Sequence, residues 1–157
     1  MKKLILTVIT AFCFTSILPA GAQEMKSTTW SAFGISFKVP ADVMIEEDSE
    51  EGFILSNDTY YVNVQILDGE AMDKASMSTE IKHMADEDQL TEQSPVTKFE
   101  LSHFHGVQLK GKNEGEFYSY NYLMSKDESG GFFITIIYPH SQDNTPEKII
   151  KSFILED

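Results

Sequence analysis

The sequence predicts an α+β fold in which a mainly antiparallel sheet of about six to seven strands is covered by two helices. Apolar and polar residues alternate with a period of two over much of the chain, as in strands with one buried face. The period becomes helical in the middle of the chain and again at its C-terminal end. Short turns join consecutive strands, which is typical of antiparallel sheets.

The first half of this pattern contains three predicted strands. The first ends at Pro40, and a turn at Asn57 and Asp58 separates the other two. These strands are predicted over residues 35–40, 53–55 and 60–67. Residues 23–29 are polar, and we expect them to be a flexible lead-in to a single domain over residues 30–157.

The helical pattern begins after Asp68 and Gly69. Met77, Ile81 and Ala85 recur at spacings of four, so one apolar stripe of a helix is predicted over residues 73–88.

The second half returns to strands and ends in a helix. Pro146 at a first helical position, after Asn144 or Thr145 as the cap, marks the start of the last helix. The strands are predicted over residues 97–101, 107–109, 116–126 and 132–138.

Residues 1–22 have the composition of a secretory signal peptide. Lys2 and Lys3 precede an apolar run, and Ala20 and Ala22 are the small residues that a signal peptidase requires. The run of 15 residues would extend about 23 Å as a helix, which is short of the roughly 30 Å hydrocarbon core. We therefore expect cleavage near Ala22 and a periplasmic or secreted protein, with an uncleaved anchor as the alternative and no stable membrane anchor after cleavage.

Charge and cysteine content exclude several classes of function. The chain has 12 cationic and 25 acidic residues, for a net charge of −13, and all the cations are lysines. Nucleic-acid binding normally needs a basic face, so it is disfavoured. Cys13 is the one cysteine and lies in the predicted signal peptide, so a disulfide or a thiolate metal site is not expected.

A resemblance follows from several short motifs. The run Phe33-Gly34-Ile35-Ser36-Phe37-Lys38-Val39-Pro40, the pair Gly106-Val107 and the ending Ser152-Phe153 resemble the PsbP-like family. That family has an aromatic residue soon after the proline, where this chain has Ala41-Asp42-Val43. The resemblance implies a PsbP-like sandwich and a bacterial binding or assembly protein without catalytic activity.

His103 and His105 are the candidate metal ligands. Residues two apart in a strand share a face and lie about 6.6 Å apart along the chain, so both imidazoles could reach one ion. A third ligand would have to come from His140 or from a carboxylate such as Glu100. A solvated hairpin end is the alternative setting, because Gly106 follows directly.

Two further clusters have a structural and a functional interpretation. Five carboxylates fall between Glu46 and Glu51, which favours a solvated loop over a loose calcium site or a contact with a basic partner. Tyr118, Tyr120 and Tyr122 form a stripe, which favours a buried sheet face over an exposed platform for sugar rings.

The sequence contains no hydrolase elbow, no paired-histidine zinc motif and no phosphate loop. We therefore expect no enzyme and no cofactor. The function predicted from these observations is an exported, non-catalytic interaction or assembly module of the cell envelope with an extracytoplasmic protein partner. The alternatives are an acidic inhibitor of a basic hydrolase such as lysozyme, and a weak metal-binding protein.

Overall fold

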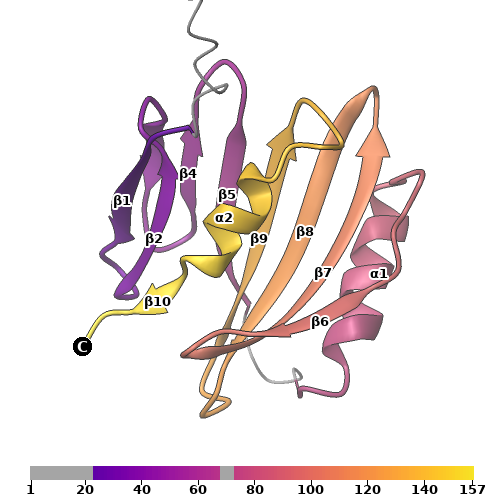
Figure 1. Cartoon of the computed structure of the whole chain (residues 1–157). Helices are drawn as coiled ribbons and strands as arrows, with labels where there is room; N and C mark the ends of the chain where they lie inside the picture. Colours follow the sequence, from indigo (N-terminus) through magenta and orange to yellow (C-terminus); the bar gives the residue numbers. More distant parts are fainter. Residues whose placement is uncertain (1–22, 68–72) are drawn as a thin grey trace, which may run out of the picture.

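A computed structural model describes residues 23–67 and 73–157. Figure 1 shows the strands and helices in chain order from the N-terminal to the C-terminal end. They are β1 (Met25–Trp30), β2 (Ile35–Pro40), β3 (Met44–Asp48), β4 (Phe53–Ser56), β5 (Tyr61–Leu67), α1 (Met77–Glu87), β6 (Thr97–Glu100), β7 (Phe104–Asn113), β8 (Glu116–Ser125), β9 (Gly131–Tyr138), α2 (Thr145–Lys151) and β10 (Ile154–Leu155).

The strands form two antiparallel sheets. The larger sheet has seven strands in the order β3-β4-β5-β9-β8-β7-β6, and the smaller sheet has the order β1-β2-β10. Figure 1 shows α2 and β10 on the side of the small sheet, and α1 beside β6 and β7. The predicted α+β class, with a mainly antiparallel seven-stranded sheet and two helices, is confirmed.

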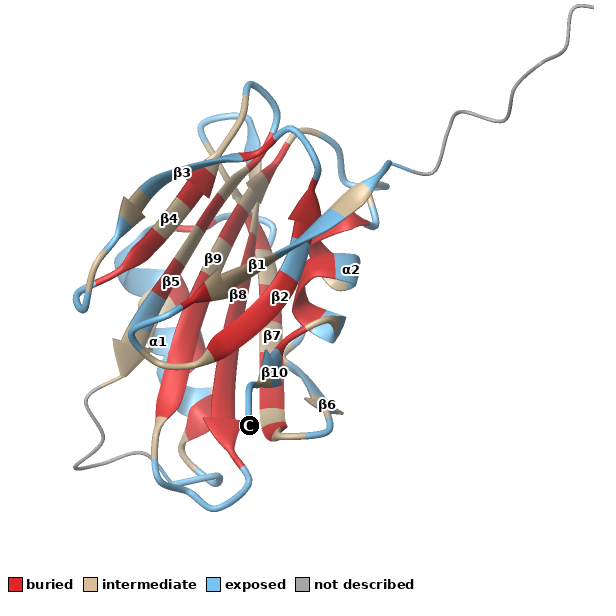
Figure 2. Cartoon of the chain, turned by 90° about the vertical axis from the view of Figure 1, so that its left-hand side faces the viewer, coloured by how far each residue is buried: buried red, intermediate tan, exposed pale blue. Residues whose placement is uncertain are grey.

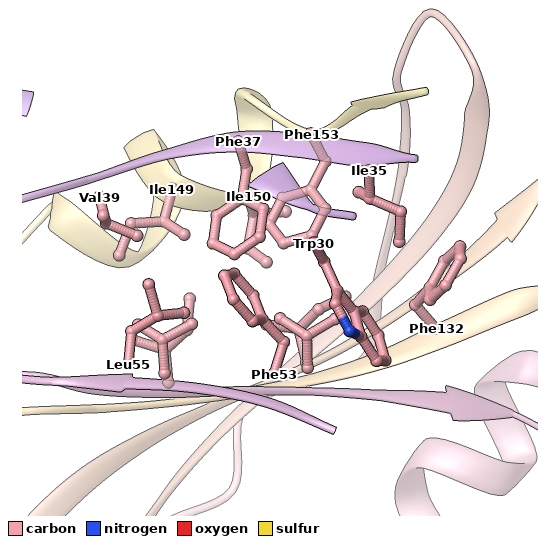
Figure 3. Close-up of a cluster of buried hydrophobic side chains, with 14 of the residues drawn as sticks. Trp30, Ile35, Phe37, Val39, Phe53, Leu55, Phe132, Ile149, Ile150 and Phe153 are labelled. Carbon is pink, nitrogen blue, oxygen red and sulfur yellow. The ribbon is translucent and has the colours of Figure 1, made fainter. Parts of the chain in front are cut away.

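The larger core lies between the two sheets and α2. Phe37 of β2 stacks on Phe153 with their ring centroids 4.2 Å apart, and Trp30 stacks on Phe53 at 6.1 Å (Figure 3). The indole Nε1–H of Trp30 donates to the Ser49 carbonyl at 2.7 Å, so the one polar atom of this buried ring is satisfied. This core fastens the small sheet to one face of the large one.

The smaller core lies on the opposite face of the large sheet, under α1. Met77, Ile81 and Ala85 of this helix are buried against residues of β7 and β8 such as Leu109 and Tyr122. The two cores occupy opposite faces because successive side chains of a strand point to opposite sides. The helix therefore covers the β7–β8 half of its face.

Three differences from the sequence predictions concern the edges of the sheets. The predicted flexible lead-in over residues 23–29 is wrong, because Met25–Trp30 forms β1 and pairs with β2. Part of the predicted carboxylate loop is wrong as well, because Met44–Asp48 forms the edge strand β3. The helix of residues 73–88 is shorter than predicted, since α1 begins at Met77.

The predicted signal peptide, with cleavage near Ala22, lies outside the described residues and stays a prediction. Within residues 23–67 and 73–157, no helix is long and apolar enough to cross a membrane.

The buried tyrosines predict how stability depends on alkaline pH. Burial, followed by the nearby carboxylates of Glu147 and Asp143, raises the pKa of Tyr138 to about 12. The phenol ionises near pH 10 in the unfolded chain, whereas the folded chain keeps it neutral. The contribution of Tyr138 to stability is therefore fully present below pH 10 and is lost as the pH rises from 10 to 12. Urea unfolding is expected to show that the free energy of unfolding falls less across this pH range for Tyr138→Phe than for the unmodified chain. Equal losses of stability in the two proteins would contradict the raised pKa of Tyr138 in the folded chain.

Candidate functional site: an open row on the sheet

None of the described helices or strands covers the α1 side of the large sheet over β3, β4, β5 and the outer part of β9. Val62 and Val64 of β5 point into the larger core, so Tyr61 and Asn63 point to the α1 side. Cross-strand pairing aligns one residue from each of five neighbouring strands. This set, called the open row below, consists of Met44, Ser56, Tyr61, Ile137 and Tyr118.

The open row is largely apolar and aromatic although it faces solvent. The Met44 side chain is 72% exposed, and Tyr61, Ile137 and Tyr118 are half-buried. Adjacent strands are about 4.8 Å apart, so the row spans about 19 Å. Figure 2 shows β3 as a largely exposed strand at the sheet edge beside β4. An apolar strip of this length on a sheet face is the kind of surface that another molecule covers.

Carboxylates lie near β3 at one end of the open row. Burial raises the pKa of the Tyr61 phenol, and the negative charges of Glu46 and Glu47 raise it further. The electrostatic potential at this end is therefore negative.

The other end of the open row is acidic too. Burial raises the pKa of Tyr118, and so do the carboxylates of Glu116, Glu114 and Asp88. The row is therefore a strip of aromatic and aliphatic side chains with negative charge at both ends.

Asn63 lies two residues along β5 from Tyr61 and on the same face. Its Oδ1 atom is buried and has no hydrogen-bond partner within the described part of the chain. A buried acceptor without a donor costs about 1–3 kcal/mol, so such an atom needs an explanation. Because this oxygen is buried, it adds no exposed acceptor to the open row.

The carboxylates of the predicted loop are divided between an edge strand and a turn. A β-bulge lies between Ile45 and Glu47, and the carboxylates of Glu46 and Glu47 accept hydrogen bonds from Ser56 and Ser49. Charges and a bulge on an edge strand prevent pairing with other chains. This part of the acidic run therefore protects the edge of the sheet and gives the open row its acidic end.

The tyrosine stripe of β8 is mostly core, as the structural interpretation of the sequence predicts. Tyr120 and Tyr122 are buried beneath α1, where their hydroxyl groups donate to the Asp88 carboxylate and to the Met84 sulfur. Tyr118 is the one member of this stripe in the open row.

The two candidate metal ligands have separate partners. His103 Nδ1 accepts a hydrogen bond of 3.2 Å from the backbone N–H of Leu155, whereas His105 Nδ1 lies 2.8 Å from a carboxylate oxygen of Glu100. His103 precedes β7, which begins at Phe104, so the strand alternation behind the prediction does not include it. No group of three or more histidine, cysteine, aspartate or glutamate side chains in the described residues could hold a metal ion.

One protein-family model matches most of the chain. A family model described as dihydro-orotase-like matches residues 6–142. The chain belongs to the dihydro-orotase-like family. No curated protein sequence matches this dihydro-orotase-like protein.

Two solved structures have the same fold as this dihydro-orotase-like protein. The Ran-binding protein Mog1p of Saccharomyces cerevisiae is 9% identical to it with a TM-score of 0.62, and the match covers 87% of this chain and 97% of Mog1p. A point mutant of the protein Mog1 is also 9% identical, with a TM-score of 0.61 and coverage of 85% of this chain and 97% of the mutant. At this level of identity the likeness establishes the fold.

These comparisons correct the predictions that rested on the PsbP-like resemblance. Membership of that family is wrong, because the matching family is dihydro-orotase-like and the structural neighbours are Mog1 proteins. The predicted function as an exported bacterial module of the cell envelope rested on that resemblance and is corrected with it by the dihydro-orotase-like match. So are its alternatives, the acidic hydrolase inhibitor and the weak metal-binding protein.

Proposed function

We propose that this dihydro-orotase-like chain is a non-catalytic domain that binds another folded protein through the open row. The observation that carries the proposal is the alignment of Met44, Tyr61, Ile137 and Tyr118 on an uncovered sheet face. Aromatic and methionine side chains are enriched in the centres of protein interfaces. Tyrosine in particular forms a large contact at a small cost in conformational entropy.

The acidic ends of the open row specify the chemistry of the partner. Carboxylates of Glu46 and Glu47 at one end, and of Glu114 and Glu116 at the other, complement a partner with lysine or arginine around an apolar centre. Such charges accelerate association and exclude acidic competitors. The partner class that fits is therefore a protein with a mixed basic and apolar surface.

A protein partner also agrees with the structural neighbours. Mog1p is a Ran-binding protein and has this fold over 97% of its length. Ran is therefore the first defined protein to test against this chain.

The absence of a catalytic role is part of the proposal. The polar groups beside the open row are carboxylates, serine hydroxyls and one asparagine amide, and two of the carboxylates already accept hydrogen bonds from serines. These groups suit recognition of cations and N–H donors.

Site-specific photo-crosslinking tests the proposal. A photoreactive side chain at Ile137, in the middle of the open row, is expected to form a covalent adduct with one protein in an extract of the source cells. Purified Ran is added in a parallel reaction. For the protein that is captured, Tyr61→Ala is expected to weaken binding at least tenfold, as for a central interface residue.

The matched control carries the same photoreactive group at Lys38. This residue is exposed on β2, on the outer side of the small sheet. Adduct formation should be specific to position 137 and should decrease as salt rises, because the charges of Glu46 and Glu116 are screened. Equal labelling from both positions would show that the open row is not the binding surface.

A further inference from the structure

A second surface lies on the opposite side of the large sheet, where α2 leaves a cavity against β6 and β7. The cavity has a volume of about 120 Å³. It is lined by Thr97, Phe99, Gln108, Glu147, Ile150 and Lys151, and it is called the α2 cleft below. It does not include any residue of the open row.

A network of buried polar side chains lies beneath the α2 cleft. Ser119 and Asn121 are fully buried, and Gln108 lies beside them, because it pairs with Asn121 across β7 and β8. The amide Nε2 of Gln108 donates to Asn121 Oδ1 at 2.9 Å. Buried hydrogen-bond networks of this kind hold their side chains in one orientation.

Backbone carbonyls determine the orientation of the side-chain amides in this network. Asn121 Nδ2 donates to the carbonyl oxygens of Ser119 and Ile134, at 3.2 and 3.4 Å. These carbonyls can only accept, so Asn121 must turn Nδ2 to them and Oδ1 to Gln108. Gln108 must then turn Nε2 inward. Within the described part of the chain its hydrogen bonds all use Nε2, which leaves the carbonyl oxygen Oε1 as an acceptor at the cleft.

The walls of the α2 cleft are apolar. The Phe99 ring occupies the space beside Gly106, since a Cβ at that glycine would be 2.3 Å from the ring. Ile150 of α2 is buried and forms the opposite wall. A flat molecule between these side chains would replace water with apolar contacts.

The rim of the cleft is held in place by an ion pair. Lys110 Nζ pairs with the Glu147 carboxylate, which links β7 to α2, and both side chains are partly buried. Glu147 also lines the cleft, but its carboxylate is held by Lys110. Gln108 Oε1 is therefore the acceptor whose direction is fixed by its neighbours, whereas the Thr97 hydroxyl at the cleft can rotate.

We propose that the α2 cleft binds a small aromatic molecule with one N–H or O–H donor, of the size of phenol. A cavity of 150 Å³ holds a benzene ring, so about 120 Å³ accommodates one six-membered ring with its edge at the open side. The ring lies between Phe99 and Ile150, and its donor hydrogen-bonds to Gln108 Oε1. This combination of apolar walls and one fixed polar atom is typical of small-molecule sites.

Titrations of the full chain with phenol and with toluene test this proposal. The two rings have nearly the same shape, but toluene has no donor and is the more apolar molecule. Methyl signals of Ile150 and side-chain amide signals of Gln108 are followed by NMR. Phenol is expected to give saturable shifts at both residues and to bind at least about threefold more tightly than toluene, as one neutral hydrogen bond predicts. Equal or tighter binding of toluene would overturn the proposal, as would the absence of saturable shifts with phenol.

Gln108→Met supplies a second measurement. Methionine has a similar volume but no carbonyl oxygen, so the preference for phenol over toluene is expected to disappear. Retention of the preference in this variant would show that the donor binds elsewhere. If the variant does not fold, the comparison of phenol with toluene in the unmodified chain still decides the question.

Discussion

Replacing Phe153 with alanine is expected to lower the free energy of unfolding by about 3–5 kcal/mol. This side chain is 1% exposed and stacks on Phe37, with their ring planes 5° from parallel. It lies between α2 and β10 and joins both to the small sheet. Strands on both sides cannot close the resulting cavity, so the cost includes the lost contacts as well as the lost burial.

Urea unfolding followed by the fluorescence of Trp30, which lies in the same core, measures this loss. Ile154→Ala is the matched control, because Ile154 is the next residue and is 44% exposed. Its expected effect is below about 1 kcal/mol. Similar losses for the two variants would mean that the C-terminal segment, and not the Phe153 ring, carries the stability.

Much of this fold is visible in the sequence because burial is periodic. Strands β2, β5, β8 and β9 contain apolar residues at every second position, and each lies against a core. Helix α1 has one apolar stripe, and it is buried as predicted. Elements with one buried face produce a regular pattern, which is why these predictions are confirmed.

The missed strands lie at edges, where the pattern weakens. Along β1 only Trp30 is fully buried, so the strand reads as a polar segment. Strand β3 consists of Met44, Ile45 and three carboxylates, and none of these side chains is fully buried. The backbone pairing that makes them strands leaves no periodic trace in the side chains.

The geometric argument for a metal site at His103 and His105 is wrong for a related reason, although the site itself stays a prediction. It required His103 and His105 to belong to one regular strand, but β7 begins between them at Phe104. Element boundaries are the least visible feature of a sequence, so a prediction that depends on strand phase at a boundary is fragile.

The open row depends on long-range pairing, which the sequence does not reveal. Tyr61 and Ile137 are 76 positions apart but are cross-strand partners. One local signal was present: both are large apolar residues on the side of their strands that a one-sided sheet would leave polar. In β9 the residues from Phe132 to Tyr138 are apolar or aromatic except for Thr135, which indicates that both faces of that strand are covered or are used for binding.

The second large effect is expected at Gly106, where alanine should destabilise the chain by about 1–3 kcal/mol through overpacking. A Cβ at this position would lie 2.3 Å from the Phe99 ring, so the ring must leave the β7 backbone and swing into the α2 cleft. Edge strand β6 would lose its main apolar contact with β7.

The Phe99→Ala background distinguishes this clash from a general effect of replacing glycine in a strand. Once the ring is removed, Gly106→Ala should cost far less, and the difference is the coupling energy between the two positions. Gly130→Ala is the control, because a Cβ there would meet nothing within 4 Å. Urea unfolding of the unmodified chain, the two single variants and the double variant measures the coupling energy. If Gly106→Ala destabilises the Phe99→Ala variant as much as the unmodified chain, Gly106 is needed for its backbone conformation and not for the space that it leaves to the ring. A smaller cost in that background would mean that Gly106 positions the Phe99 wall of the α2 cleft by letting the ring lie directly on the strand.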